Sequence, residues 1–393
     1  MSSPKTDSLW SAFLPLLPLT AATFLGYFAM GMAMPVLPLH VHGALGQSTV
    51  MVGVVMGAQY LSALLVGRMW SGQVADAHGS KTAAVAGLLG VVLAVASLYF
   101  ASLLAADRPA LATGIVIAAR LATGIAESFF ITAMLTWGIA RVGPAHAGKV
   151  IGWVDMALFA AYGAGAPVGV AVHARFGFAG IAWATVAVPL AALGLVALLR
   201  GVAPSGAPRQ PFYKVLNAVK LPGAALTLAS LGYGVFMAFI ALLFAQRGWV
   251  GTAWAFLSLG GGFIAARLLF GHLPDRLGGG RVGLACAGVQ VVAQLLIWGA
   301  QGPLLACVGA ALTGGAYALA FQGFGVESVR RAPPESRGAA MGGYVAFQDV
   351  AMGLAAPLGG WLAGAAGLGS VYLAGAVGAA GAGVVSLMLL RTK

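Results

Sequence analysis

The chain contains few charged residues and very few acidic ones. Only 8% of its 393 residues are charged, with nine Asp and Glu against 21 Lys and Arg. Soluble domains usually contain about 25% charged residues, so this chain has too little polar surface to cover a water-facing globule. Cysteine is also scarce. Cys286 and Cys307 both fall in apolar stretches, where we expect them to pack as small apolar residues rather than form a disulfide.

Several catalytic motifs are missing as well. The sequence has no Gly-x4-Gly-Lys-Ser/Thr loop, which argues against ATP-driven pumping, and neither a His-Glu-x2-His pair nor a nucleophile elbow. We therefore predict no enzymatic activity, no cofactor and no metal site. Met30, Met32 and Met34 precede His40 and His42, and such soft ligands suit copper. Because a spacing of two does not place them on one helix face, core packing is the favoured interpretation.

Long apolar stretches are abundant, and glycine is frequent, with 59 residues. Small residues allow transmembrane helices to pack closely. Each stretch is long enough for a span of about 20 residues. The predicted spans are 12–39, 48–71, 82–104, 110–140, 149–172, 178–200, 222–245, 251–272, 282–300, 304–328, 340–362 and 370–390. The pattern predicts an all-α membrane protein with twelve helices in two bundles, 1–200 and 222–393, joined by a cytoplasmic linker, 201–221.

The basic residues indicate the orientation of these spans. The net charge of +12 suggests nucleic acid in a soluble protein, but its placement here argues otherwise. With both termini inside, fifteen of the Lys and Arg residues fall in cytoplasmic segments and only three in outer loops. We therefore predict both termini in the cytoplasm and a multi-pass protein whose partners are the lipid bilayer and a small molecule, with no nucleic acid.

One turn signature occurs twice, each time at the end of an apolar helix. The segments are RMWSGQVADAHGSK and RLLFGHLPDRLGGGR. The Arg, Gly and Asp of each copy lie on one helix face, and the following Gly allows a tight reversal. Weaker echoes support a duplication, because Leu25-Gly26-Tyr27 is matched by Leu231-Gly232-Tyr233. The residues of the two copies are Arg68, Gly72, Asp76, Gly79 and Lys81, and Arg267, Gly271, Asp275, Arg276 and Gly278.

Two such halves related by an axis along the membrane normal resemble the major facilitator superfamily. The duplicated turn is similar to the loop signature of that superfamily, and Arg120-x3-Gly124 to its fourth-helix Arg motif. Gly165, Pro167 and Gly169 resemble its antiporter-associated helix-5 motif, although Ala166 stands where Gly is usual. The first span further resembles bacterial drug and sugar efflux members. The resemblance implies alternating access and a cytoplasmic gate built from the duplicated turn.

Acidic residues within spans are candidate coupling sites, because an ionisable group at the bilayer centre costs about 2.5–3.5 kcal/mol. Glu127 lies two helical turns beyond Arg120, and we expect either a proton-coupling or substrate-binding role or a structural ion pair with Arg120. In the first case Arg120 would tune Glu127 or bind an anionic group. Asp349 is a second candidate for coupling. Asp155 is a weaker one, because it lies close to cytoplasmic water. Glu327 sits near Arg330, and we assign it to the gate.

The remaining predictions concern the cavity and the function. Arg337 is placed with Glu327 in the cytoplasmic gate. The polar and aromatic residues expected to line the cavity are Tyr27, Gln59, Trp137, Tyr233 and Gln348. We expect a monomeric secondary transporter of the bacterial inner membrane that exports a small drug-like or sugar-like molecule by proton antiport. The alternatives are an importer or uniporter of the same fold and, more remotely, a non-transporting membrane sensor.

Overall fold

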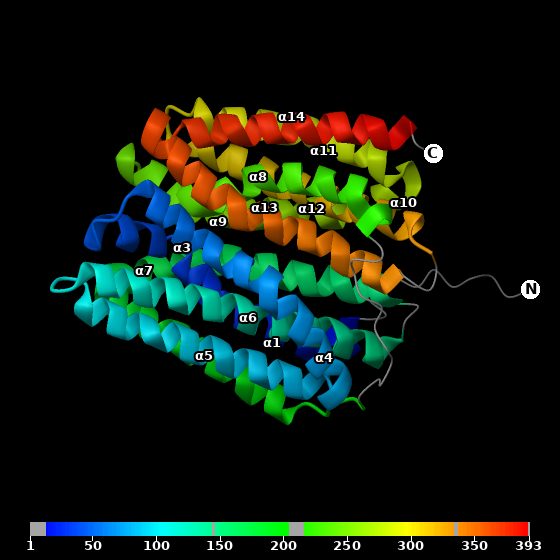
Figure 1. Cartoon of the computed structure of the whole chain (residues 1–393), viewed down its shortest axis with the longest axis horizontal. Helices are drawn as coiled ribbons and strands as arrows, with labels where there is room; N and C mark the ends of the chain where they lie inside the picture. The colour runs from blue at the N-terminus through cyan, green and yellow to red at the C-terminus, as the bar shows by residue number, and fades with distance from the viewer. Residues whose placement is uncertain (1–12, 144–145, 204–215, 334–336, 392–393) are drawn as a thin grey trace, which may run out of the picture.

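The computed structural model describes residues 13–143, 146–203, 216–333 and 337–391. Within these ranges the chain is a bundle of long helices that run roughly parallel to one another (Figure 1). The first half contains α1 (Phe13–Ala33), α2 (Leu37–Leu39), α3 (Thr49–Ser62), α4 (Arg68–His78), α5 (Ser80–Leu104), α6 (Pro109–Val142) and α7 (Ala147–Leu198), with π-helical turns at His40–Ala44 and Ala63–Gly67. The second half contains α8 (Leu216–Gln246), α9 (Thr252–Phe270), α10 (Leu273–Leu277), α11 (Gly279–Trp298), α12 (Pro303–Arg331), α13 (Arg337–Ala366) and α14 (Ser370–Arg391).

The helices match the predicted spans closely. Among the described residues, ten helices are long and apolar enough to cross a membrane. One of them, α7, contains two predicted spans and bends at Gly177, whose φ of 63° a side chain would disfavour. A further predicted span corresponds to α13. The all-α membrane fold is thus confirmed, and the helices are consistent with twelve spans.

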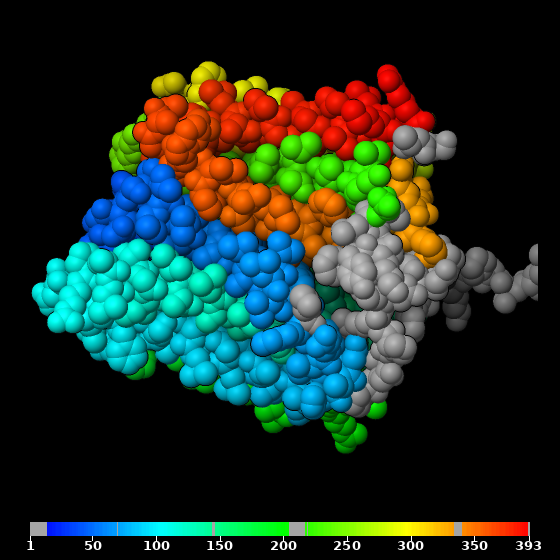
Figure 2. Space-filling view, in the orientation of Figure 1, coloured from blue at the N-terminus to red at the C-terminus, as the bar shows by residue number. Residues whose placement is uncertain are grey.

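Helices pack on one another within each half of the chain, and the halves also contact each other. In the first half α1 packs on α7 and α5 on α6, and in the second α11 packs on both α12 and α14. Figure 2 shows the two halves as adjoining blocks of cool and warm colours. Helix α8 begins at Leu216, within the segment 201–221 that was predicted to link the halves. Residues 204–215 of that segment lie outside the described part of the chain.

Both copies of the duplicated turn adopt the same backbone geometry. Gly79 has φ 87° and ψ 154°, and Gly278 has φ 86° and ψ 147°. These dihedral angles lie in a region that residues with a side chain rarely adopt, so glycine is required at each reversal. The predicted tight turn after each Asp is confirmed. Each glycine separates two helices, α4 from α5 and α10 from α11.

Two seams join the halves. In the first, α3 lies against α13, where the Thr49 hydroxyl donates a 2.7 Å hydrogen bond to the Gly360 carbonyl. Further along, Gly57 faces the backbone of Gly353 so closely that a side chain on Gly57 would meet its carbonyl. In the second seam, α7 lies against α9, and the rings of Phe159 and Phe263 stack at 3.6 Å between centroids. Small residues and stacked rings thus close both seams.

Candidate functional site

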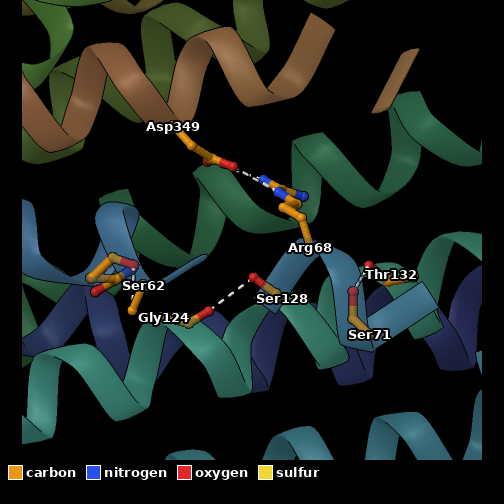
Figure 3. A network of polar contacts seen from close by, with 8 residues as sticks. Ser62, Arg68, Ser71, Gly124, Ser128, Thr132 and Asp349 are labelled. Atoms are coloured by element: carbon orange, nitrogen blue, oxygen red, sulfur yellow. Dashed lines mark hydrogen bonds and ion pairs between the residues drawn. The ribbon is translucent and has the colours of Figure 1, made fainter. Parts of the chain in front are cut away.

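The first seam ends in an ion pair between the halves. Arg68 opens α4, directly after the π-helical turn Ala63–Gly67, and its guanidinium points toward α13 (Figure 3). Its Nε donates to Asp349 Oδ2 at 2.7 Å and its Nη2 to Oδ1 at 3.1 Å. This two-pronged geometry is the strong form of an Arg–carboxylate pair. The Asp349 side chain is 5% exposed and that of Arg68 is 30% exposed, so the carboxylate is buried while the guanidinium is partly accessible.

The second seam ends in a related but looser pair. Arg267, in α9, occupies the same motif position as Arg68, and its Nη2 lies 3.9 Å from Oδ2 of Asp155, in α7. Each duplicated turn therefore contributes an arginine that reaches a carboxylate on the opposite half. The two pairs form a pseudo-symmetric set near the predicted cytoplasmic ends of the seams.

This arrangement changes the interpretation of two predicted residues, Asp349 and Asp155. Asp349 was predicted as a coupling site, but its two oxygens are occupied by Arg68. Asp155 was expected to face cytoplasmic water, whereas it is partly buried beside Arg267. Aligning the two halves of the sequence could not predict these two ion pairs. Asp155 and Asp349 do not occupy matching positions in the repeat, because they are displaced from each other by about one helical turn. The contacts also depend on segments far apart in the chain.

A second cluster surrounds Glu127 in α6. The Gln59 side-chain amide, from α3, donates to Glu127 Oε2, and Tyr27 of α1 interacts with the same carboxylate. Gln59 and Tyr27 are almost completely buried. Three helices of the first half thus converge on one carboxylate, and three residues predicted to belong to the site come together.

Arg120 does not form the expected ion pair with Glu127. Seven residues along a helix correspond to about 10.5 Å, and Glu127 is instead bonded to Gln59. Arg120 is 6% exposed, and its Nε and Nη2 are buried without a hydrogen-bond partner in the described structure. Its electrostatic neighbours are Tyr60, Glu127 and Tyr162. The cluster therefore contains a buried cation whose donors are free.

Aromatic residues connect this cluster to the other half. The ring of Tyr27 meets Tyr162 edge-on at 5.8 Å, and Phe159, one turn before Tyr162, approaches Tyr233 at 5.9 Å. Tyr233 stacks on Tyr317 at 4.5 Å. Of these aromatic residues, only Tyr27 and Tyr233 were predicted from the sequence. Phe159 and Tyr162 could also have been predicted, because they are spaced i, i+3 in a span that carries a carboxylate.

Several other predicted residues lie away from this cluster. Trp137 is fully buried beneath Arg141, whose guanidinium carbon is 5.4 Å from the ring centroid. Gln348 is half-buried on α13, next to Asp349. Met30, Met32 and Met34 are buried in the core as expected. No group of three potential ligands for a metal occurs among the described residues.

The remaining gate residues take different positions. Lys81 stays within the first half, where its ammonium donates to the carbonyls of Ala197 and Leu199 at 2.7 and 2.8 Å. Asp275 and Arg276 are exposed on α10. Glu327 is buried and lies 3.8 Å from Arg331, which agrees with its predicted place in a terminal charge network. Arg337 begins α13, and its side chain lies outside the described part of the structure.

The helix-5 motif brings α7 against α1. A side chain at Gly165 would meet the backbone of Phe28 and Gly31, and one at Gly169 would meet the backbone of Met32. Pro167 lies between them within α7. The glycines of this motif therefore permit tight packing between the first and fifth predicted spans.

The long apolar helices of the described residues, with charged side chains buried where the first and second halves of the chain meet, are those of a multi-span membrane protein. Comparison with known proteins agrees. The model of the Major Facilitator Superfamily matches residues 19–246, and the chain belongs to this superfamily of transporters. It is 38% identical to an uncharacterized MFS-type transporter of Salmonella typhimurium, covering 96% of this chain and 97% of that protein. A relative from Burkholderia pseudomallei is also 38% identical, over 100% and 96% of the two chains.

Solved structures share the fold at low identity. A mutant of the nucleoside transporter NupG has a TM-score of 0.73 at 14% identity and covers 95% of this chain and 99% of its own. An inward-facing bacterial homologue of the lysosomal transporter Spinster has a TM-score of 0.74 at 12% identity, with 98% of each chain covered. The predicted superfamily and the absence of enzymatic activity are confirmed, because relatives and fold neighbours are transporters.

Proposed function

We propose that this protein is a proton-coupled secondary transporter of small organic molecules, in which Glu127 carries the proton. The observation behind this proposal is the Glu127 cluster. A carboxylate in the interior of a transmembrane bundle is costly unless it is used, and here side chains from two other helices, Gln59 of α3 and Tyr27 of α1, interact with it. Aromatic side chains extend the cluster to the second half, so movement between the halves would change the surroundings of this carboxylate.

The two cross-bundle ion pairs support alternating access as the mechanism. Arg68–Asp349 and Arg267–Asp155 join the halves near the predicted cytoplasmic side. A path from the centre to the cytoplasm requires the seams to part at these pairs. We propose that they form the cytoplasmic gate, with the membrane orientation given by the positive-inside pattern and the bacterial inner membrane as the location. The protein is proposed to act as a monomer.

Efflux by proton antiport is a second, more specific candidate. It is favoured by the tight packing of α1 on α7 at Gly165 and Gly169, where the sequence resembles an antiporter-associated motif. A drug-like or sugar-like molecule would then leave the cell as a proton enters. Import driven by the same proton gradient is the alternative.

Transport by purified protein in liposomes tests the proposed coupling. A panel of small organic molecules is first screened for compounds that raise the thermal unfolding midpoint of the protein. Flux of each stabilising compound is then measured with and without an imposed pH gradient. We expect the gradient to drive accumulation against a concentration difference. Downhill flux that ignores the gradient would contradict proton coupling, and a complete absence of flux would favour the sensor alternative.

A further inference from the structure

Arg120 is a buried guanidinium with unused hydrogen-bond donors. It is 6% exposed, and Nε and Nη2 have no partner in the described structure. These two nitrogens form one edge of the guanidinium fork, which suits the two oxygens of an oxyanion. A buried charge is normally compensated, because an unpaired ion in a low-dielectric interior is costly. The structure therefore contains a buried guanidinium that has a charged neighbour, Glu127, but no acceptor for two of its donors.

Among the described residues, no carboxylate accepts a hydrogen bond from these two nitrogens. Glu127 accepts a hydrogen bond from Gln59 and interacts with Tyr27, and Asp349 is held by Arg68. Asp155 lies beside Arg267 in the second seam. The other two electrostatic neighbours of Arg120 are the tyrosines Tyr60 and Tyr162, which are neutral hydrogen-bonding groups. No acceptor for these two donors is thus supplied by the described part of the chain, and a bound anion would supply one.

The charge balance of the site links this partner to the proton. Arg120 and an ionised Glu127 together are neutral. An anion on Arg120 alone would leave one net negative charge, and a proton on Glu127 alone would leave one net positive charge. An anion and a proton together restore neutrality. Because net charge is costly inside a membrane bundle, the empty and the doubly loaded site are the two states that can change access readily.

Other charged groups near Glu127 do not upset this balance. Arg68 and Asp349 both act on Glu127, but they compensate each other as a bidentate pair. The polar neighbours contributed by the surrounding helices are neutral at ordinary pH. They are Tyr27 of α1, Tyr60 of α3, Tyr162 of α7 and Tyr233 of α8.

We propose that the substrate is a small organic anion whose carboxylate, sulfonate or phosphate group binds Arg120, and that it crosses the membrane together with one proton on Glu127. This inference rests on the proposed proton coupling and adds the substrate class and the direction of coupling. Anion and proton favour each other's binding, so their movements are linked in the same direction. An inward proton gradient would then drive uptake, and antiport would be excluded.

Binding is tested first, with purified full-length protein and a panel of organic carboxylates, sulfonates and phosphate monoesters, each beside its neutral amide or alcohol. Thermal shift should show stabilisation by at least one anion and none by its neutral analogue. Arg120→Gln should weaken the binding of this anion about 10- to 100-fold, as expected for the loss of charge-assisted hydrogen bonds. Arg108→Gln is the matched control, because Arg108 is exposed in a loop, and it should bind normally.

Proton movement is tested next in liposomes that contain a pH-sensitive dye. The probe is the tightest-binding sulfonate or phosphate ester, because these anions do not cross bilayers as neutral acids. An inward anion gradient should acidify the interior with the wild type and with Arg108→Gln. Arg120→Gln should abolish this acidification. Glu127→Gln should also abolish it while keeping exchange of labelled for unlabelled anion.

The outcomes separate the two proposals. The anion site is wrong if no panel anion stabilises the wild type above its neutral analogue, or if Arg120→Gln binds as tightly as the wild type. Interior alkalinisation on anion entry would instead show exchange for a proton and overturn the proposed direction. If anion binding depends on Arg120 but no proton moves in the wild type, the proposed proton coupling fails while the anion site stands.

Discussion

The guanidinium of Arg68 and the carboxylate of Asp349 form a bidentate ion pair between the two halves of the molecule, with Nε–Oδ2 and Nη2–Oδ1 distances of 2.7 and 3.1 Å. The two residues belong to different bundles and are brought together where α4 begins and α13 crosses it (Figure 3). A conformational change that separates the bundles at this point must break the pair. The relationship therefore makes the balance between access states sensitive to either residue.

Arg68→Gln is expected to shift the protein toward the state that is open on the predicted cytoplasmic side. The substitution removes two charge-assisted hydrogen bonds, each worth about 1.5–3 kcal/mol in general, and leaves Asp349 without its partner. Distances between spin labels on the terminal ends of α4 and α13 would report the shift, after Cys286 and Cys307 are replaced.

The double variant Arg68→Gln/Asp349→Asn supplies the control for that prediction. Because both residues act through one contact, the double variant should shift the equilibrium no further than the single variants do. Fully additive shifts would show that the two residues act separately, and the pair would then not be a gate.

Arg267→Gln should have the same effect with a smaller magnitude. Its Nη2 lies 3.9 Å from Asp155 Oδ2, which is an ion pair without a hydrogen bond of normal length. The same spin-label measurement applied to the ends of α7 and α9 would compare the two seams. A larger change in label distances in Arg267→Gln than in Arg68→Gln would contradict the expectation that the bidentate pair stabilises the closed seam more than the looser pair does.

Gly53→Val should act in the opposite direction, by preventing closure of the outer part of the first seam. A side chain at Gly53 would collide with the backbone of Ala356 and Pro357 in α13. Labels or thiol reagents applied from the outer side should therefore reach the seam more readily. Gly114→Val is the matched control, because a side chain there meets nothing within 4 Å. Unchanged outer access in Gly53→Val would mean that this contact does not limit opening.

Phe159→Ala should lower stability by about 3–5 kcal/mol, the usual cost of removing a buried phenyl ring. Phe159 is 8% exposed and stacks on Phe263 across the second seam. The thermal unfolding midpoint in detergent measures the effect. Phe176→Ala is the control in the same helix, because Phe176 is 64% exposed, and it should change the midpoint little. Equal losses in both variants would argue that the stack contributes nothing.

The helices and the duplicated turns were predictable because they depend on local sequence. Apolar runs of span length set the helix bounds, and glycine at positions 79 and 278 fixed the reversals. The bend at Gly177 separates two spans that were predicted from composition alone. Membrane insertion makes such local signals strong, because each span must satisfy its own backbone hydrogen bonds.

The charge partners were not predictable in the same way. Glu127 and Arg120 share a helix face, which favoured a pair between them, but the side chain of Gln59 from another helix takes the carboxylate instead. Asp349 was a coupling candidate because it is an acidic residue within a predicted span, whereas Arg68 reaches it from the opposite half. Such contacts depend on how the bundles pack, and only the assembled structure shows them.

The coupling role of Glu127 is tested most directly by comparing two kinds of transport in Glu127→Gln protein. Liposomes loaded with a transported compound measure exchange, which needs no net proton movement, and an imposed pH gradient measures accumulation. Asp107→Asn serves as the control for the loss of a carboxylate, because Asp107 is exposed in the turn after α5. We predict that Glu127→Gln keeps exchange and loses accumulation, while Asp107→Asn keeps both. Full gradient-driven accumulation by Glu127→Gln would contradict the account.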